Sequence, residues 1–230
     1  ISHEVLEGIN QAIGLAEAHY NSLILWTESA PFSVGADLKA VMPHFMTGNW
    51  QAIDELIALF QHTSLNIRHS DIPVVAAVQG YALGGGCEFL LHADRVVASL
   101  ESYIGLVEVG IGLIPAGGGV KEFALRAARE SKGDLLASLK DKYRHIALAQ
   151  VATSALEAKE LGYLKPDDVV IFNSYELLNV AMSEAYALAN ANYRPLKEVA
   201  FVVGGESVAA SIESELLNMQ VGGFISEYDY

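Results

Sequence analysis

An apolar run that leads into three consecutive glycines constrains this chain more than any other feature. Residues 74–78 are all Val or Ala, and the turn 80–86 that follows ends in Gly84, Gly85 and Gly86. A short apolar run bounded by glycine predicts a buried β-strand. Consecutive glycines let the chain turn sharply and let a ligand approach the bare backbone. We therefore expect a strand that turns directly into a helix.

A second unit of the same kind precedes it, because the run 22–27 predicts a buried strand and the glycine-containing turn 32–38 follows. Apolar residues at helical spacing predict a first helix, capped by Ser2. The same patterns predict a helix over 53–67, strands at 95–98, 102–104 and 168–172, and a helix through 181–189 ended by Pro195. Alternating strands and helices indicate an α/β domain, and the chain after Gly119 reads as mostly helical.

Charge and hydrophobicity exclude several classes of protein. The chain has 14 Lys and Arg against 28 Asp and Glu, a net charge of -14, so nucleic acid is not an expected partner. It is 52% hydrophobic and 18% charged, unlike a disordered segment. Its apolar runs fall short of the roughly 20 residues of a membrane span, and its first residues show no basic and apolar signal pattern, so we do not expect secretion. With one cysteine, Cys87, it cannot form an internal disulfide, and we expect a cytoplasmic location.

The sequence predicts no nucleotide loop and no metal site. The turn 80–87 lacks the Gly-Lys-Ser/Thr ending of a phosphate loop, and 110–115 has proline where the dinucleotide fingerprint has glycine. The seven histidines are scattered without metal-ligand spacing, so each is expected to be an ordinary core or surface residue.

Two glutamates are candidates for chemistry. Glu88 follows the triple glycine, and Glu108 lies in the otherwise apolar stretch 104–110. Burying a carboxylate costs folding free energy unless the group is hydrogen-bonded or is kept for its chemistry. Two close carboxylates can hold one proton between them at neutral pH. That property suits general acid/base catalysis. The residues alone leave open the alternative that Glu88 caps its helix and Glu108 is exposed.

Half of the basic residues lie in one stretch, namely Lys121, Arg126, Arg129, Lys132, Lys140, Lys142 and Arg144. Four acidic residues are mixed among them, so the stretch is expected to form a solvated helical face. The alternative is a patch that faces an anionic ligand or partner.

Three motifs resemble, in order and spacing, the signature of the crotonase, or enoyl-CoA hydratase, family. They are 32–38, 80–88 with Asp94, and Glu108 with 114–119. The resemblance runs from about residue 13 to residue 128. The charged stretch 130–144 looks like an insertion, and with 92–95 and 154–164 it most resembles the hydratase domain attached to bacterial 3-hydroxyacyl-CoA dehydrogenases. We expect one crotonase-like domain over 1–230, with a core at about 1–128 and an insertion and helical part at about 129–230.

The resemblance implies an α/β fold, a spiral of ββα units with a helical C-terminal part. Such domains usually build trimers, so a homotrimer or a dimer of trimers is expected for the full-length protein. The chain begins at Ile1 without a methionine and lacks the opening β-hairpin of the family. We therefore expect a domain cut from a longer chain that carries an NAD-dependent 3-hydroxyacyl-CoA dehydrogenase part.

The resemblance also implies roles for residues. The backbone amides of Ala36 and Gly85 would form an oxyanion hole for the thioester carbonyl, a role that glycine-rich turns fill without side chains. Glu88 would activate the water that adds to the β-carbon, and Glu108 would protonate the α-carbon. The turn of Ala36, Asp37, Leu38 and Lys39 would lie beside the adenine of coenzyme A. No metal or redox cofactor is implied, because the acyl-CoA substrate supplies its own acidity.

The predicted function is that of an enoyl-CoA hydratase of fatty-acid β-oxidation, which adds water in the syn sense to 2-enoyl-CoA thioesters. One alternative is a Δ3-Δ2-enoyl-CoA isomerase, since family isomerases often work with one acid/base group. Another is a non-catalytic acyl-CoA-binding module. The presence of both glutamates favours hydration.

Overall fold

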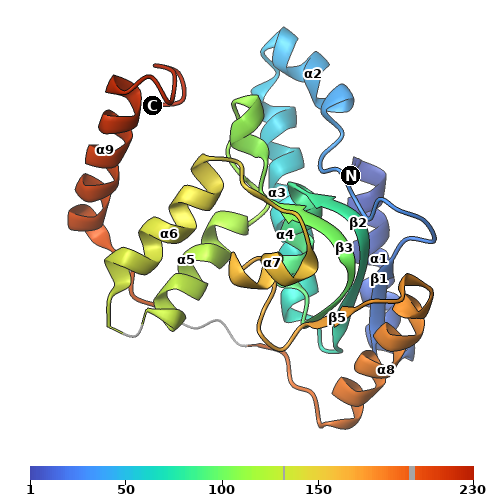
Figure 1. Ribbon diagram of the computed structural model, residues 1–230. Coiled ribbons are helices and arrows are strands. Elements are labelled where there is room, and N and C mark those ends of the chain that lie inside the picture. Colours follow the sequence, from blue (N-terminus) through green and yellow to red (C-terminus); the bar gives the residue numbers. More distant parts are fainter. Residues whose placement is uncertain (132, 197–199) are drawn as a thin grey trace.

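The computed structural model describes residues 1–131, 133–196 and 200–230 and shows an α/β fold around a five-stranded sheet (Figure 1). Strands β1 (Leu23–Trp26), β2 (Val74–Leu83), β3 (Arg95–Gly105) and β5 (Val169–Ile171) are parallel, in the order β1-β2-β3-β5. The short β4 (Val151–Ala152) pairs antiparallel with the end of β3. The predicted α/β class is confirmed, and β4 was not predicted.

Helices surround this sheet and make up most of the second half of the chain. They are α1 (His3–His19), α2 (Leu38–Thr47), α3 (Trp50–His69), α4 (Gly85–His92), α5 (Gly119–Glu130), α6 (Leu135–Ala147), α7 (Ala155–Glu160), α8 (Leu177–Asn190) and α9 (Gly205–Val221), with 3-10 turns η1 (Glu108–Ile111) and η2 (Ser174–Glu176). Helix α9 lies at the edge of the molecule, away from the sheet (Figure 1). None of the described helices is both long and apolar enough to cross a bilayer.

Strand β2 is buried on both faces, which explains its continuous apolar sequence. Val74, Ala76 and Val78 join the main core formed with α1, α3 and α4. Val75 and Ala77 join a second core formed with α8. Because successive residues of a strand point to opposite faces, these two cores hold β2 in register and fix where the glycine turn begins.

Strand β3 corrects one prediction, because 95–98 and 102–104 form one strand instead of two. The pairing of β2 with β3 shifts register between Val78 and Gly80, which pair with Ala98 and Ser102. The extra residues lie on β3, so that strand continues through an irregularity between the two predicted strands.

The helix predicted to end at Pro195 ends earlier. Helix α8 ends at Asn190, and the amide of Ala191 donates to the carbonyl of Ala187 at 3.1 Å. Asn192 then adopts a left-handed conformation, φ 58°, which a helix cannot continue. The first helix does begin as predicted, since the Ser2 hydroxyl accepts a hydrogen bond from the Val5 amide.

Candidate active site

The glycine turn after β1 lies alongside the end of β2. The amide of Ser33 donates to the carbonyl of Tyr81, and the amide of Leu83 donates to the carbonyl of Ser33, both at 2.9 Å. Gly35, with φ +99°, then brings the chain against the triple glycine, where a Cβ atom on residue 35 would be 3.8 Å from the Gly85 nitrogen. The structure thus brings together two turns that lie 50 residues apart in sequence.

Ala36 and Gly85, the predicted oxyanion-hole residues, lie on these adjoining turns. Gly85 begins α4, so its amide has no acceptor within the helix. Neither amide donates a hydrogen bond to another of the described residues. A Cβ atom on residue 85 would lie 2.4 Å from the Phe60 ring, so only glycine fits there. Amides left free beside a helix N-terminus suit negative charge on an oxygen.

Glu88 lies on the first turn of α4 and is only 3% exposed. Its Oε1 accepts a hydrogen bond from the Gly119 amide at 2.8 Å, at the start of α5. Burial raises the pKa of Glu88 to about 7, and the nearby Glu108 adds to the rise, while the amides of Gly119 and Gly117 oppose it. The carboxyl therefore reaches across to α5 instead of capping its own helix. A pKa near neutrality lets it take up and release a proton.

Glu108 begins η1, directly after β3, and is half-buried. Its carboxyl packs against Gly84, where a Cβ atom would be 3.1 Å from Oε1. Its Oε2 is buried and has no hydrogen-bond partner in the described part of the chain. Burial raises the pKa of Glu108 as well. A buried carboxyl oxygen without a hydrogen-bond partner costs folding free energy. Such groups are found most often at sites that bind a ligand or catalyse a reaction.

The site that results centres on Gly84 and Gly85. Two free amides can hold a developing oxyanion, and two carboxyl groups with raised pKa can exchange protons with a bound molecule. Over residues 1–131, 133–196 and 200–230, no group of three or more His, Cys, Asp or Glu side chains is arranged to hold a metal ion.

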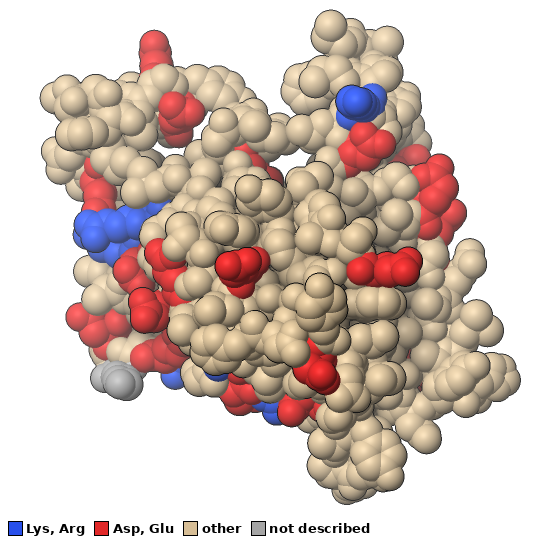
Figure 2. All heavy atoms as spheres, turned by 45° about the vertical axis from the view of Figure 1, so that its right-hand side comes forward, with Lys and Arg blue, Asp and Glu red and all other residues tan. Residues whose placement is uncertain are grey.

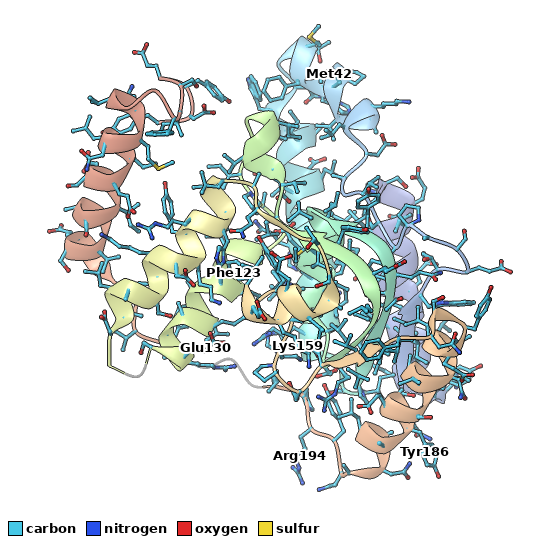
Figure 3. The ribbon with its side chains drawn as sticks, in the orientation of Figure 1. Met42, Phe123, Glu130, Lys159, Tyr186 and Arg194 are labelled. Atoms are coloured by element: carbon cyan, nitrogen blue, oxygen red, sulfur yellow. The ribbon has the colours of Figure 1, made fainter. Side chains whose placement is uncertain are left out.

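The turn predicted to lie beside coenzyme A is accessible. Ala36, Asp37, Leu38 and Lys39 are all exposed. Asp37 also has a structural role, because its carboxylate caps α2 by accepting from the amide of Lys39 at 3.0 Å. Met42, one turn further along α2, stands at the outer tip of the molecule (Figure 3) and is 53% exposed.

The predicted solvated face in 121–144 is wrong for Arg126 and Lys142. Arg126 is buried and donates to the carbonyls of Leu91, Gly162 and Tyr163 at 2.8–3.1 Å. Lys142 is also buried, and its ammonium lies 5.6 Å from the ring centre of Phe123 and 3.8 Å from the Glu130 carboxylate (Figure 3).

Three of the other basic residues in that stretch are exposed or half-buried and form ion pairs. Arg144 and Lys140 both form ion pairs with Glu215 of α9. Lys121 pairs with its neighbour Glu122 at 3.0 Å. Arg129 is exposed, and Lys132 lies outside the described residues. Arg126 thus joins α5 to neighbouring segments, and Lys140 and Arg144 join α6 to α9, whereas the exposed Lys121 and Arg129 agree with the predicted solvated face.

Acidic side chains are spread over the face of the molecule in Figure 2, where basic side chains form only a few small areas. This distribution agrees with the net charge of -14. An anionic ligand that approaches this face must therefore be attracted locally.

Sequence reasoning missed His92, which it treated as an ordinary residue. His92 is 1% exposed, and its Nδ1 lies 2.7 Å from the carbonyl oxygen of Glu88. It also missed the amide of Gly119 as a partner of Glu88. The signal for His92 was its spacing of four residues from Glu88 on one helix, which places the two side by side.

Comparison with known proteins agrees with the motifs. Residues 1–162 match the family described as "Enoyl-CoA hydratase/isomerase". All 230 residues align at 36% identity with a probable 3-hydroxyacyl-CoA dehydrogenase of Bacillus subtilis and cover 29% of it. Over 191 residues, 83% of this chain, identity to a putative fatty acid oxidation complex trifunctional enzyme of Rickettsia felis is 35%, with 24% of that protein covered. The chain spans less than a third of the length of either relative.

Solved structures share the fold. An enoyl-CoA hydratase from Bacillus anthracis superimposes with a TM-score of 0.67 at 26% identity, covering 82% of this chain and 67% of that one. One from Mycobacterium smegmatis gives 0.68 at 19% identity, covering 96% and 82%, a likeness of fold alone. These neighbours confirm the predicted crotonase-like fold, and the matches together confirm the resemblance to the multifunctional dehydrogenases.

Proposed function

Since this chain belongs to the enoyl-CoA hydratase/isomerase family, we propose that it adds water to 2-enoyl-CoA thioesters with Glu88 and Glu108 as its acid/base pair. One observation carries the proposal. Two carboxyl groups with raised pKa, from the different elements α4 and η1, lie close enough for Glu108 to raise the pKa of Glu88, and Glu108 packs against Gly84, next to the free amide of Gly85. Proton transfer and oxyanion stabilisation are the two tasks that hydration of a conjugated thioester requires.

In the proposed reaction the amides of Ala36 and Gly85 bind the thioester oxygen. Glu88 takes a proton from water as the water oxygen bonds to the β-carbon, and the electrons of the double bond move to the thioester oxygen as an enolate. These electrons then return to the α-carbon, which takes a proton from Glu108. The net change is one H and one OH added, and the proton on Glu88 returns through solvent to Glu108.

The raised pKa values suit acid/base chemistry by this pair of carboxyl groups. Because the pKa of Glu88 is about 7, a substantial fraction is ionised at neutral pH and can act as a base. Burial also raises the pKa of Glu108, and we assign to this second carboxyl the delivery of the proton. Two coupled carboxyls share their protons as a pair, so activity should follow the ionisation of both together.

The proposal extends to a longer protein, because the matched relatives are more than three times the length of this chain. We propose that the hydrated product passes to an NAD-dependent dehydrogenase part of the same protein. The nicotinamide cofactor would bind outside this chain, since 110–115 lies in and after η1 and offers no strand-to-helix glycine turn.

The test follows loss of the absorbance of the conjugated thioester when crotonyl-CoA is added, and exchange of the α-proton in deuterium oxide. Glu88→Gln should lose about 10²–10⁴-fold in hydration and keep α-proton exchange, whereas Glu108→Gln should lose both. The double variant should be little worse than the poorer single one. Glu101→Gln, at an exposed glutamate on β3, is the matched control and should hydrate at the parental rate.

Three outcomes would contradict the proposal. Parental hydration by Glu88→Gln would move the isomerase alternative ahead, and conversion of 3-enoyl-CoA would then be measured. Tight titration of coenzyme A with no loss of absorbance in the unsubstituted protein would indicate a binding module. Retention of α-proton exchange in Glu108→Gln would show that another group delivers the proton.

A further inference from the structure

His92 joins two parts of the structure that hold Glu88. It ends α4, the helix that carries Glu88, and its side chain is 1% exposed. Its Nδ1 lies 2.7 Å from the carbonyl oxygen of Glu88, and because a carbonyl only accepts, Nδ1 must carry the hydrogen. The ring is thereby tied to the backbone of the residue whose carboxyl faces the site.

The same ring packs against the glycine loop that opens α5. A Cβ atom on Gly118 would lie 2.8 Å from Cε1 and 2.9 Å from Nε2 of His92, and Gly118 has φ +111°. Only glycine satisfies both the conformation and the contact. The next residue, Gly119, donates its amide to Oε1 of Glu88 at 2.8 Å. The imidazole therefore supports the loop whose amide holds the Glu88 carboxylate.

Charged groups lie beyond the far side of the ring, where Nε2 has no hydrogen-bond partner among the described residues. Nε2 of His92 faces Oε1 of Glu122 at 3.6 Å, and the other oxygen of Glu122 accepts from Arg68 at 2.8 Å. Lys121 lies 3.0 Å from Oε1. Burial lowers the pKa of His92 to about 4, against the opposing effect of Glu122, so the ring is neutral at physiological pH. A neutral ring with hydrogen on Nδ1 keeps its bond to the Glu88 carbonyl without adding charge beside the site.

We propose that His92 is a positioning residue for Glu88, which holds helix α4 and the glycine loop 117–119 at the spacing that keeps the Gly119 amide on the Glu88 carboxylate. The catalytic consequence rests on the proposed function, whereas the structural one does not. The groups that face Glu88 and His92 are Glu108 from η1, Glu122 and Lys121 from α5, and Arg68 from α3.

The proposal has a measurable electrostatic consequence. A hydrogen bond donated to a carboxylate stabilises the ionised form, so a loosened Gly119 amide must raise the pKa of Glu88 further. His92→Ala removes both the ring under Gly118 and the donor to the Glu88 carbonyl. The expected rise in the pKa of Glu88 is about one unit, the scale of one weakened charged hydrogen bond. His92→Asn restores a donor near the Nδ1 position and should return part of that shift.

The experiment is a ¹³C NMR titration of protein labelled at its glutamate carboxyl groups, with the Glu88 resonance assigned by its loss in Glu88→Gln. His145→Ala is the matched control, because His145 is also buried but contacts Asp141 and Tyr163 instead of the glycine loop. Its Glu88 titration should be parental. Circular dichroism and thermal melting establish that each variant is folded before it is titrated.

An unchanged Glu88 titration in folded His92→Ala would overturn the proposal, as would an equal shift in His145→Ala. If His92→Ala does not fold, the His92→Asn titration decides in the same way. The acid limb of the hydration profile should move to higher pH with the titration. Because the titration needs no substrate, it tests the role of His92 even if the unsubstituted protein fails to hydrate crotonyl-CoA. That failure would contradict the proposed function and leave the role of His92 unaffected.

Discussion

The carboxyl group of Glu108 rests against the backbone of Gly84: a Cβ atom on residue 84 would lie 3.1 Å from Oε1 and 3.5 Å from the carboxyl carbon. Gly84 also has φ 53° and ψ -123°, a conformation that residues with side chains rarely adopt. The missing side chain thus serves two purposes. It permits the turn that starts α4 at Gly85, and it leaves room for Glu108 to reach that turn.

Gly84→Ala should therefore impair both stability and activity. We expect a loss of about 1–3 kcal/mol in the free energy of unfolding from backbone strain, measured by urea titration. Hydration should fall by about 10–100-fold in the fraction that remains folded, because the methyl group displaces the Glu108 carboxyl. Gly133→Ala is the control, since Gly133 also has positive φ, +99°, but has nothing within 4 Å of its Cβ position. Equal activity losses in the two variants would refute the role of the contact.

The raised pKa of Glu88 predicts that its ionisation weakens the fold. Its carboxyl binds a proton more tightly in the folded state, at about 7, than at the ordinary value of 4.5. The stabilisation that the protonated Glu88 carboxyl gives to the folded state is therefore complete below about pH 4.5. It is lost as the pH rises to 7 and above. Glu88→Gln should be more stable than the unsubstituted protein at pH 8, by up to roughly 3 kcal/mol, and gain little at pH 4. Denaturant titrations at both pH values test this, and a gain that is the same at both would contradict it.

Substitution of Arg126 should have a large effect on stability without an effect on catalysis. Its guanidinium group satisfies three buried carbonyls on the segments that flank α5. Arg126→Leu leaves them unpaired and should cost about 3 kcal/mol or more in the free energy of unfolding. Arg129→Leu, at an exposed position on the same helix, should change stability by less than about 0.5 kcal/mol. If the two variants unfold at the same urea concentration, the carbonyl contacts are not stabilising.

We predict that the side chain of Lys39 attracts coenzyme A locally and that this attraction is weakened by salt. Its exposed ammonium follows the Ala36 turn in a chain of net charge -14. Lys39→Gln should raise the dissociation constant of coenzyme A about two- to five-fold at low salt, and the difference should vanish near 1 M salt. Arg194→Gln removes an exposed charge at the opposite end of the molecule from α2 (Figure 3) and should leave the constant unchanged. Calorimetric titration measures both, and equal effects of the two substitutions would contradict a local contact.

Local pattern determined much of the fold. The runs at 22–27 and 74–78 both form strands, and each is followed by a glycine turn where positive φ is needed. Residues 74–78 are buried on both faces, whereas β1 is only partly buried and Trp26 is 41% exposed, so the prediction that 22–27 is a buried strand is wrong in its burial. The strands and their turns depend on near neighbours in sequence, so they can be recognised without the structure. The two glutamates were singled out for the same reason, since each stands in an apolar or glycine-rich segment.

Tertiary structure decided which groups meet and which charges are buried. Gly35 reaches Gly85, and Gly119 reaches Glu88, only because β2 and the helices around it pack as they do. Arg126 lies among acidic and basic neighbours that suggest a solvated face, yet three carbonyls from distant segments make it a core residue. His92 belongs to the stretch 92–95 that carries part of the resemblance, but nothing in the sequence indicates its contact with the glycine loop. Hydrogen bonds and burial across 31 or more residues depend on the packing of the whole chain, and a linear pattern cannot specify them.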